Sequence, residues 1–292
     1  MTLITQLVLN GLLAGALYAV IALGLSLVFG IMKIINFAHG SLLMLAMYAG
    51  FWSWKLFGIN PYVLALIVAP ASFVMGYLVE WLLIEPVFRK EYSDVQEPIG
   101  VLLLTCGLAI ALNNLALLFF SANQRTVETP VSMQILEMGD IILSLPRVYA
   151  FVGSVILTAA IYYFLSRTMV GKAMTAIAQD RDAARLIGVN VDQIYRLSFA
   201  LNAAMLGVAG IFLLPFFSVF PEVGELFNLK SFVVVVLGGV GSIPAVFLGG
   251  LVVGFVESFG TYLWSAMGAE VLLFAVFITF LLFRPKGLLG KE

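Results

Sequence analysis

The sequence predicts an all-α, polytopic integral membrane protein. Of its 292 residues, 62% are hydrophobic and 11% are charged, and the mean hydropathy is +1.10. Soluble domains are about 45–50% apolar and about 25% charged. The apolar residues form about eight long uncharged runs, most of which reach the roughly 20 residues that a spanning helix needs. No run alternates with a period of two, as a barrel strand would.

The hydrophobic segments follow one another along the whole chain. The first has no basic residue before it and is longer and richer in glycine than a cleaved signal peptide, so we expect it to remain as a membrane helix. The last is short, and it reaches spanning length if residues 265–270 form its first turns. The uncharged runs cover residues 1–32, 34–54, 56–79, 98–124, 148–166, 197–221, 231–256 and 271–283.

Basic and acidic residues are divided between different loops. Two loops are mainly acidic and carry Glu128, Glu137, Asp140, Glu222 and Glu225. Lysine and arginine gather at three other places, which contain Arg89 and Lys90, then Arg167, Lys172, Arg181, Arg185 and Arg196, and finally Arg284, Lys286 and Lys291. By the positive-inside rule, these basic places face the cytoplasm. The net charge of −1 predicts no nucleic-acid partner.

The glycine-rich run at residues 231–258 is predicted to be a broken or re-entrant element. Three simple crossings after the central basic loop would place the basic C-terminal residues outside, against their own charge. The apolar run is interrupted near its middle by Gly238, Gly239, Gly241, Ser242 and Pro244. Unwound backbone at membrane depth is tolerated only where it is buried in protein or lines a water-filled path.

A similar interruption occurs in the first half, at residues 30–50, where Lys33 and Gly40 stand among apolar residues. The two breaks indicate two structural repeats of about four segments each, a common plan among transporters. Polar groups in a bilayer usually face the bundle interior. We therefore predict a translocation path lined by Asn36, His39, Ser41, Gly238, Gly239, Gly241 and Ser242.

Two alternatives concern the polar residues in these segments. Asn36 and His39 could instead cap the broken backbone, which would leave them without a role in transport. Asn113 and Asn114 are neighbours in the fourth segment, and we expect one of them to bond an adjacent helix.

The stretch QDRDAARLIGVNV at residues 179–191 resembles a soluble surface helix within this apolar chain. Asp180 is suited to the N-cap, and Gly188 supplies the left-handed residue that commonly ends a helix. A short helix at residues 181–187 is therefore predicted on the cytoplasmic face. The alternative is a solvated connecting loop.

The segment DAARLIG at residues 182–188 resembles the EAA loop of ABC-importer permeases: an acid, two alanines, three residues and a glycine, with aspartate in place of the usual glutamate. Three more stretches, INFAHGSLLMLAMY, VLGGVGSIPAVFLGGLVVG and RPKGLLG, resemble the LivH-type permeases of branched-chain amino-acid importers. The resemblance covers essentially the whole chain in order.

This resemblance implies a permease subunit of an ABC importer in the bacterial inner membrane, for branched-chain or other hydrophobic amino acids. The implied partners are a homologous second permease, two P-loop ATPases, a periplasmic binding protein and membrane lipid. Residues 1–292 would form a single transmembrane permease domain, and residues 167–196 its coupling loop. The implied ATPase-coupling residues are Arg181, Asp182, Ala183, Ala184, Arg185 and Gly188, with the small alanines letting another surface come close.

The chain carries no P-loop of the G-x-x-x-x-G-K-[ST] type, so ATP and Mg²⁺ would bind to partner ATPases and no cofactor is expected in this chain. An enzymatic function is not expected either. One histidine and one cysteine cannot build the usual zinc sites. His39 and Ser41, two residues apart on a helix, do not face each other as a catalytic dyad must.

An ion-coupled secondary transporter remains the alternative transport function. Such a protein should carry an acidic residue at mid-membrane or a dedicated ion site. By the segment boundaries above, the membrane-proximal acids all lie near segment ends: Glu80, Glu85, Glu257 and Glu270.

Two G-x-x-x-G pairs, Gly11 with Gly15 and Gly250 with Gly254, lie on apolar segments and permit close approach of another helix. The approaching helix could belong to a partner permease or to this chain.

Overall fold

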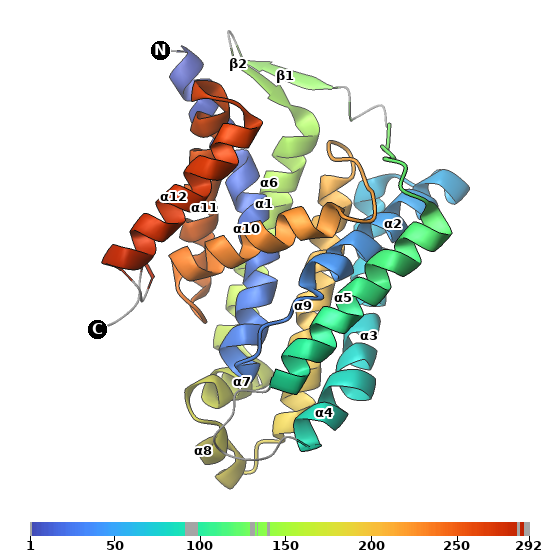
Figure 1. Ribbon diagram of the computed structural model, residues 1–292, viewed down its shortest axis with the longest axis vertical. Helices are drawn as coiled ribbons and strands as arrows, with labels where there is room; N and C mark the ends of the chain where they lie inside the picture. Colours follow the sequence, from blue (N-terminus) through green and yellow to red (C-terminus); the bar gives the residue numbers. More distant parts are fainter. Residues whose placement is uncertain are drawn as a thin grey trace.

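The computed structural model describes residues 2–90, 99–128, 132, 134–138, 141–284 and 287–288, and it confirms the all-α membrane fold (Figure 1). The helices are α1 (Thr2–Met32), α2 (His39–Phe57), α3 (Pro61–Val79), the π-helical η1 (Glu80–Ile84), α4 (Glu85–Lys90), α5 (Ile99–Phe120), α6 (Leu145–Arg167), α7 (Met169–Gln179), α8 (Arg181–Leu186), α9 (Val191–Leu213), α10 (Val223–Gly238), α11 (Ile243–Leu263) and α12 (Ala266–Phe283). A short antiparallel hairpin, β1 (Ile135–Met138) and β2 (Ile141–Ser144), precedes α6.

Seven of the described helices are long and apolar enough to cross a membrane: α1, α3 with its extension through η1 and α4, α5, α6, α9, α11 and α12. The sequence predicted about eight segments. The segment that does not count as a spanning helix is the second, at residues 34–54. It forms α2 after the first break, and most of its length is buried among other helices.

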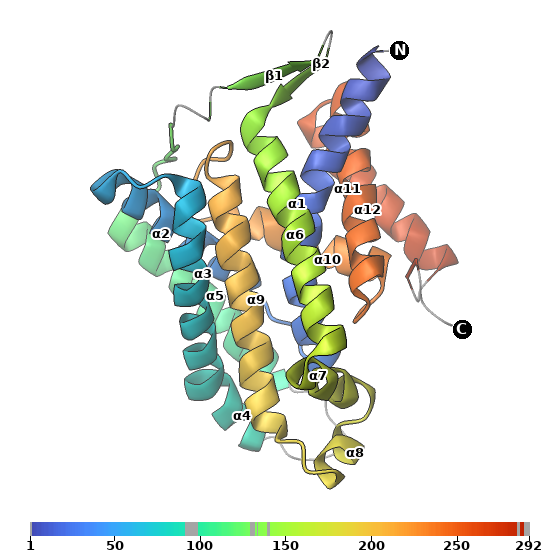
Figure 2. The ribbon, with the colours of Figure 1, turned by 180° about the vertical axis from the view of Figure 1, so that it is seen from behind.

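The two ends of the bundle carry different elements. The start of α1 and the β-hairpin lie at one end, while α7 and α8 lie at the other (Figures 1 and 2). The α7–α8 end carries Lys172, Arg181 and Arg185 and is therefore cytoplasmic. This places the start of α1 on the outer side. Of the predicted loop charges, Asp140, Lys286 and Lys291 lie outside the described residues.

The second predicted break is present between α10 and α11. α10 has 16 residues, a length of about 24 Å, which is short of the roughly 30 Å hydrocarbon core. It runs across the bundle from the outer end of α9, and α11 then returns to the outer end (Figure 1). α12 runs back toward the cytoplasmic side, as the positive-inside rule requires for the basic residues that follow it.

The G-x-x-x-G glycines pack against each other within the chain. A Cβ placed on Gly254 would lie 2.2 Å from the carbonyl oxygen of Gly11, and one on Gly15 would lie 2.7 Å from that of Gly250. α1 and α11 therefore run with their backbones in contact. Of the two possibilities that the sequence left open, intrachain packing is correct.

Two sets of four helices make corresponding contacts. α1 packs along α11, and α9 packs along α3. Likewise α10 contacts α1, while α2 contacts α9. The sets α1, α2, α3, α5 and α9, α10, α11, α12 run in opposite directions through the bundle (Figures 1 and 2). The expected repeats of four segments are thus inverted repeats, and the second break corresponds to the α2–α3 turn rather than to the first break.

Candidate functional site

The short cytoplasmic helix α8 is fixed by caps at both ends. The carboxylate of Asp180 accepts hydrogen bonds from the backbone N–H groups of Asp182 (3.0 Å) and Ala183 (2.9 Å). Gly188 follows the helix with φ of +87°, the left-handed conformation that favours glycine. Both predicted caps are confirmed, and the helix ends at Leu186, one residue earlier than expected.

Packing divides the predicted coupling residues into an inner and an outer set. Ala184 is 2% exposed and packs into the chain, where α8 contacts α7 and α9. This corrects the expectation that Ala184 lets an ATPase come close, because its small side chain instead lets α8 lie against its own bundle. Arg181 is half-buried, and the exposed residues are Asp182, Ala183, Arg185 and Gly188.

The most exposed apolar residues of the coupling loop are ones that the sequence did not single out. Leu186 and Ile187 are 89% and 77% exposed at the cytoplasmic end of the molecule. Adjacent apolar residues on a polar turn were the available signal. An apolar pair facing water in this way is typical of a protein contact surface.

Arg181 joins α8 to the base of the membrane helices. Its guanidinium carbon lies 5.8 Å from the ring centroid of Phe88 in α4 and 5.7 Å from that of Tyr195 in α9. These are cation–π contacts. The two rings also contact each other, with centroids 5.5 Å apart.

Next to Tyr195, Arg196 forms an ion pair with the π-helical region. Its Nε lies 2.6 Å and its Nη2 2.9 Å from the carboxylate of Glu85, which begins α4. Glu80, 1% exposed in η1, lies 3.9 Å from the same Nε. π-helical turns are frequent at functional sites. Through Arg181 and Arg196, α8 is thus connected to both α9 and the lower end of α3.

At the first break, Asn36 and His39 each form a hydrogen bond with a backbone group. Asn36 Oδ1 accepts the N–H of Ala38 at 3.0 Å, and His39 Nε2 lies 3.1 Å from the carbonyl oxygen of Ile21 in α1. Both side chains are fully buried. This geometry favours the capping alternative for Asn36, whereas His39 bonds the neighbouring helix α1.

Ser41 connects the first break to the exposed surface of the bundle formed by α5 and α10. Its hydroxyl donates to Asn113 Oδ1 at 2.9 Å, and Asn113 Nδ2 donates to Glu225 Oε1 at 3.0 Å. Asn113 therefore bonds two neighbouring helices, α2 and α10, which confirms the expectation for one of the paired asparagines. The chain of polar groups leads from buried Ser41 to exposed Glu225.

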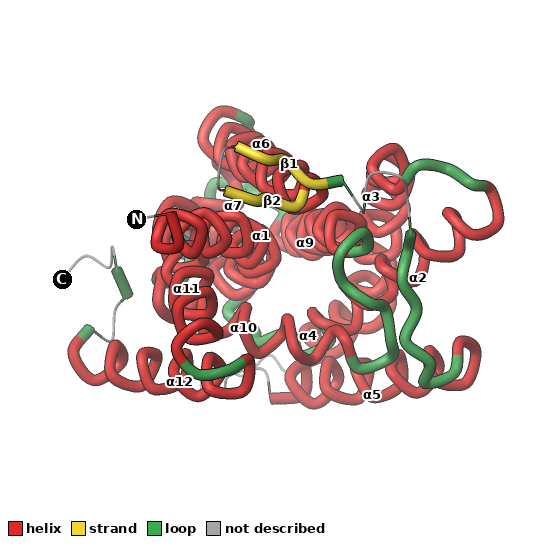
Figure 3. The backbone as a smooth tube through the Cα atoms, turned by 90° about the horizontal axis from the view of Figure 1, so that it is seen from above, coloured by secondary structure: helices red, strands yellow, loops and turns green. Residues whose placement is uncertain are grey.

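These groups belong to a polar surface strip on α5 and α10, which we define as Asn113, Asn114, Glu222 and Glu225. The four residues line a pocket of about 260 Å³. α5 and α10 lie on the same side of the bundle in both views (Figures 1 and 3). The sequence analysis missed the strip because it placed the two acids in an outer loop.

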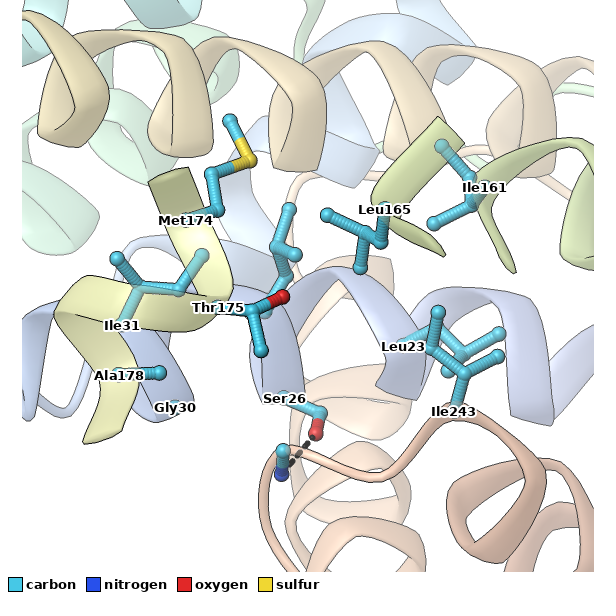
Figure 4. A pocket seen from close by; sticks show the side chains of 12 residues that line it. Leu23, Ser26, Gly30, Ile31, Ile161, Leu165, Met174, Thr175, Ala178 and Ile243 are labelled. Carbon is cyan, nitrogen blue, oxygen red and sulfur yellow. Dashed lines mark hydrogen bonds between the residues drawn. The ribbon is translucent and has the colours of Figure 1, made fainter. Parts of the chain in front are cut away.

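The second break turns sharply at two glycines. Gly239 and Gly241 have φ of +99° and +83°, a region that side chains disfavour. The N–H of Gly241 donates to Ser26 Oγ in α1 at 3.1 Å (Figure 4). Ser242, half-exposed, directly precedes α11.

Gly238 and the C-terminal motif pack tightly around this turn. A Cβ on Gly238 would lie 2.6 Å from the Cα of Val246. A Cβ on Gly287 would lie 2.6 Å from the Cα of Gly239. The N–H of Leu288 donates to a carbonyl oxygen of α10 at 2.9 Å. The described part of the RPKGLLG motif is thus attached to the second break.

The second break also lies beside the coupling loop. A pocket of about 70 Å³ is lined by residues of α1, α6, α7 and the turn into α11, among them Ser26, Thr175, Gly241 and Ile243 (Figure 4). Of the second-break residues, Gly241 lines this pocket together with residues of α7. The structure places His39 against α1 and Ser41 against α5, while Asn36 bonds the backbone within the first break.

One partly buried ion pair in the bundle was not anticipated. Lys230 of α10 lies 2.9 Å from Glu257 of α11 and 3.3 Å from the hydroxyl of Tyr18 in α1. The sequence did not indicate this pair, because its members lie 27 positions apart on separate helices.

The chain matches a family model described as the permease component of branched-chain amino acid transport systems, over residues 7–282. This chain belongs to that permease family.

Individual relatives agree with the family match. The high-affinity branched-chain amino acid transport system permease protein BraD of Pseudomonas aeruginosa is 31% identical, over 98% of this chain and 95% of the relative. LivH of Salmonella typhimurium, described likewise, is 32% identical with the same coverage. A probable LivH of Methanocaldococcus jannaschii is 29% identical over 98% of this chain and 93% of the relative. No solved structure matches the chain significantly.

Membership in the family settles several expectations. The protein is a multi-pass inner-membrane transport permease, because its relatives are permeases and the described residues contain seven helices able to span a membrane. The resemblance to LivH-type permeases is confirmed. The hydrolase alternative is excluded, and the family is one of ABC-importer permeases rather than of secondary transporters.

Proposed function

We propose that this permease forms, with a homologous second permease, the translocation path of an ABC importer for branched-chain or other hydrophobic amino acids. A periplasmic binding protein delivers the solute, and two ATPase subunits that bind ATP and Mg²⁺ drive the cycle. The observation that carries the proposal is the cytoplasmic helix α8, which is capped at both ends, anchored by Ala184 and exposes Leu186 and Ile187 to a partner.

The connections of α8 support its role as the coupling helix. Arg181 contacts α4 and α9, and Arg196 of α9 holds Glu85. α7 lies against the pocket that borders the second break. A displacement of α8 by docked ATPases would therefore reach α3, α9 and the α10–α11 turn without passing through lipid.

The polar strip supports the location of the path at a contact with a second permease. Exposed Asn114, Glu222 and Glu225 are costly against lipid tails and are tolerated where they face water or protein. A second permease across this face would enclose the strip and create a water-accessible route. Asn113 and Ser41 would form its inner wall.

The branched-chain substrate class rests on the names of the relatives. Solute affinity then belongs chiefly to the binding protein, and the path needs only weak polar contacts. Such a path suits an amino acid with an apolar side chain.

The proposal is tested by gentle extraction of the tagged protein from its native membrane, followed by identification of what co-purifies and by reconstitution of the recovered complex. We expect two P-loop ATPases, a second permease and ATP-dependent uptake of leucine when the binding protein is added. Recovery of this chain alone, with transport in liposomes that needs no ATP, would overturn the proposal.

A further inference from the structure

A further cavity reaches into the bundle on the outer side and shares no lining residue with the pocket at the polar strip. It has a volume of about 500 Å³ and is bordered by the outer half of α1, the start of α6, the end of α9, and α10 and α11. This volume falls within the roughly 300–1,000 Å³ typical of small-molecule sites. We call it the outer pocket.

A cation without an acidic partner stands at this pocket. Arg147, in the first turn of α6, is exposed and lies with its guanidinium carbon 5.7 Å from the ring of Phe216. Within the described residues, no aspartate or glutamate forms an ion pair with Arg147. A guanidinium is suited to bind a carboxylate through two parallel hydrogen bonds.

An anion lies in the wall of the same pocket. Glu257 is held by Lys230, with 2.9 Å between Nζ and each carboxylate oxygen, and its side chain is 30% exposed. A carboxylate offers about four lone-pair positions, so Glu257 retains capacity to accept from a second ammonium group. Asn10 and Thr261 add neutral polar groups to the lining.

The remaining wall is aromatic and apolar. Phe217 and Phe227 contact each other at 5.1 Å between centroids, and Phe227 also contacts Tyr18 at 6.3 Å. Leu13 and Leu17 complete this side of the pocket. Such a wall buries an aliphatic or aromatic side chain and has no fixed charge to repel it.

We infer that the outer pocket binds a zwitterionic amino acid with an apolar side chain: the carboxylate on Arg147, the ammonium on Glu257 and the side chain against Phe216, Phe217 and Phe227. The inference rests on the proposed function and adds to it a solute site within this chain, separate from the binding protein. Neither ionic contact involves a residue of the polar strip.

The test measures equilibrium binding of radiolabelled leucine to the permease–ATPase complex in nanodiscs of zwitterionic lipid, without the binding protein. Leucinamide, which lacks the carboxylate, and 4-methylpentanoate, which lacks the ammonium, serve as competitors. We expect saturable leucine binding, with each competitor at least tenfold weaker than leucine.

Variants link each ligand group to its residue. Arg147→Gln should weaken leucine binding at least tenfold and leave leucinamide binding unchanged. Glu257→Gln should weaken leucine binding and leave 4-methylpentanoate binding unchanged. Arg167→Gln, an exposed arginine at the opposite end of α6, is the matched control and should bind leucine normally. Melting temperatures measured for each variant separate lost binding from lost folding.

Several outcomes would overturn the inference. Absence of saturable leucine binding, or unchanged leucine binding in Arg147→Gln, would show that the outer pocket is not the binding site. If Arg147→Gln lost only its association with the binding protein, Arg147 would be a docking residue instead. If the complex takes up leucine with ATP but shows no leucine binding at the pocket, the proposed function stands and the pocket is contradicted. If leucine binds in a manner that depends on Arg147 but ATP drives no uptake, only the proposed function is contradicted.

Discussion

The guanidinium of Arg196 holds the carboxylate of Glu85 in two hydrogen bonds, Nε to Oε2 at 2.6 Å and Nη2 to Oε1 at 2.9 Å. The two residues are 111 positions apart in the sequence, so this pair fixes the start of α9 to the start of α4. The Glu85 side chain is 7% exposed and that of Arg196 is 21% exposed.

Arg196→Gln should destabilise the protein, because it removes the guanidinium that holds the buried Glu85 carboxylate in two hydrogen bonds. Breaking a fully buried pair costs about 3–5 kcal/mol, and partial exposure of Arg196 reduces this figure. The free energy of unfolding in detergent measures the effect. The double variant Arg196→Gln with Glu85→Gln should recover part of the loss, and exposed Lys172→Gln should show none. Equal stability of Arg196→Gln and wild type would contradict the role given to the pair.

Leu186→Ser and Ile187→Ser should weaken ATPase association, since both side chains are exposed on the coupling helix. Burying one such side chain contributes about 1.5–3 kcal/mol, or roughly tenfold or more in affinity. Co-purification and ATP-driven uptake should fall together, without a change in melting temperature. Met169→Ser, equally cytoplasmic and 82% exposed, is the control. Normal ATPase recovery with both serine variants would remove this surface from the interface.

Gly188→Val should uncouple ATP hydrolysis from uptake. At φ of +87° a β-branched residue is strained by about 1–2 kcal/mol or more, while no atom lies within 4 Å of the new Cβ to clash with it. The variant therefore tests backbone conformation alone. Gly188→Asn should retain most activity, because asparagine tolerates left-handed geometry. Uptake per ATP hydrolysed is the measurement, and equal ratios for the valine and asparagine variants would remove the cap from the coupling mechanism.

Asn113→Leu should lower the uptake rate while leaving ATPase association intact. The change removes the hydrogen bonds to Ser41 and Glu225 and makes the polar strip more apolar. Leu118→Ala, on the same helix and 77% exposed, is the matched control. Uptake in proteoliposomes at saturating binding protein is the measurement. Unchanged uptake by Asn113→Leu would exclude the strip from the path.

The sequence predicted features that depend on local chemistry. The caps at Asp180 and Gly188 follow from residue types that satisfy helix ends, and the second break follows from the density of glycine together with the charge rule. Each of these signals lies within a few residues of the feature it predicts, and the structure confirms them.

Features that depend on distant contacts were not predicted. In a six-residue helix, periodicity does not determine which side faces the bundle, so the burial of Ala184 and the exposure of Leu186 emerged only from packing. The bonds Asn113–Glu225 and Lys230–Glu257 join separate helices, and their partners could not be paired from composition. The β-hairpin at residues 135–144 was likewise read as loop.

The close backbone contacts of the glycines have a mechanical consequence. α1 cannot slide along α11 while Gly11 and Gly15 interlock with Gly250 and Gly254, and Gly76 and Gly207 bring α3 and α9 equally close. We therefore expect each pair to move as a single block. The permitted hinge lies between the blocks, along the α1–α9 seam seen end-on in Figure 3. A force applied at α8 would reach α9 directly and α1 through α7, so we expect it to change the angle between the two blocks.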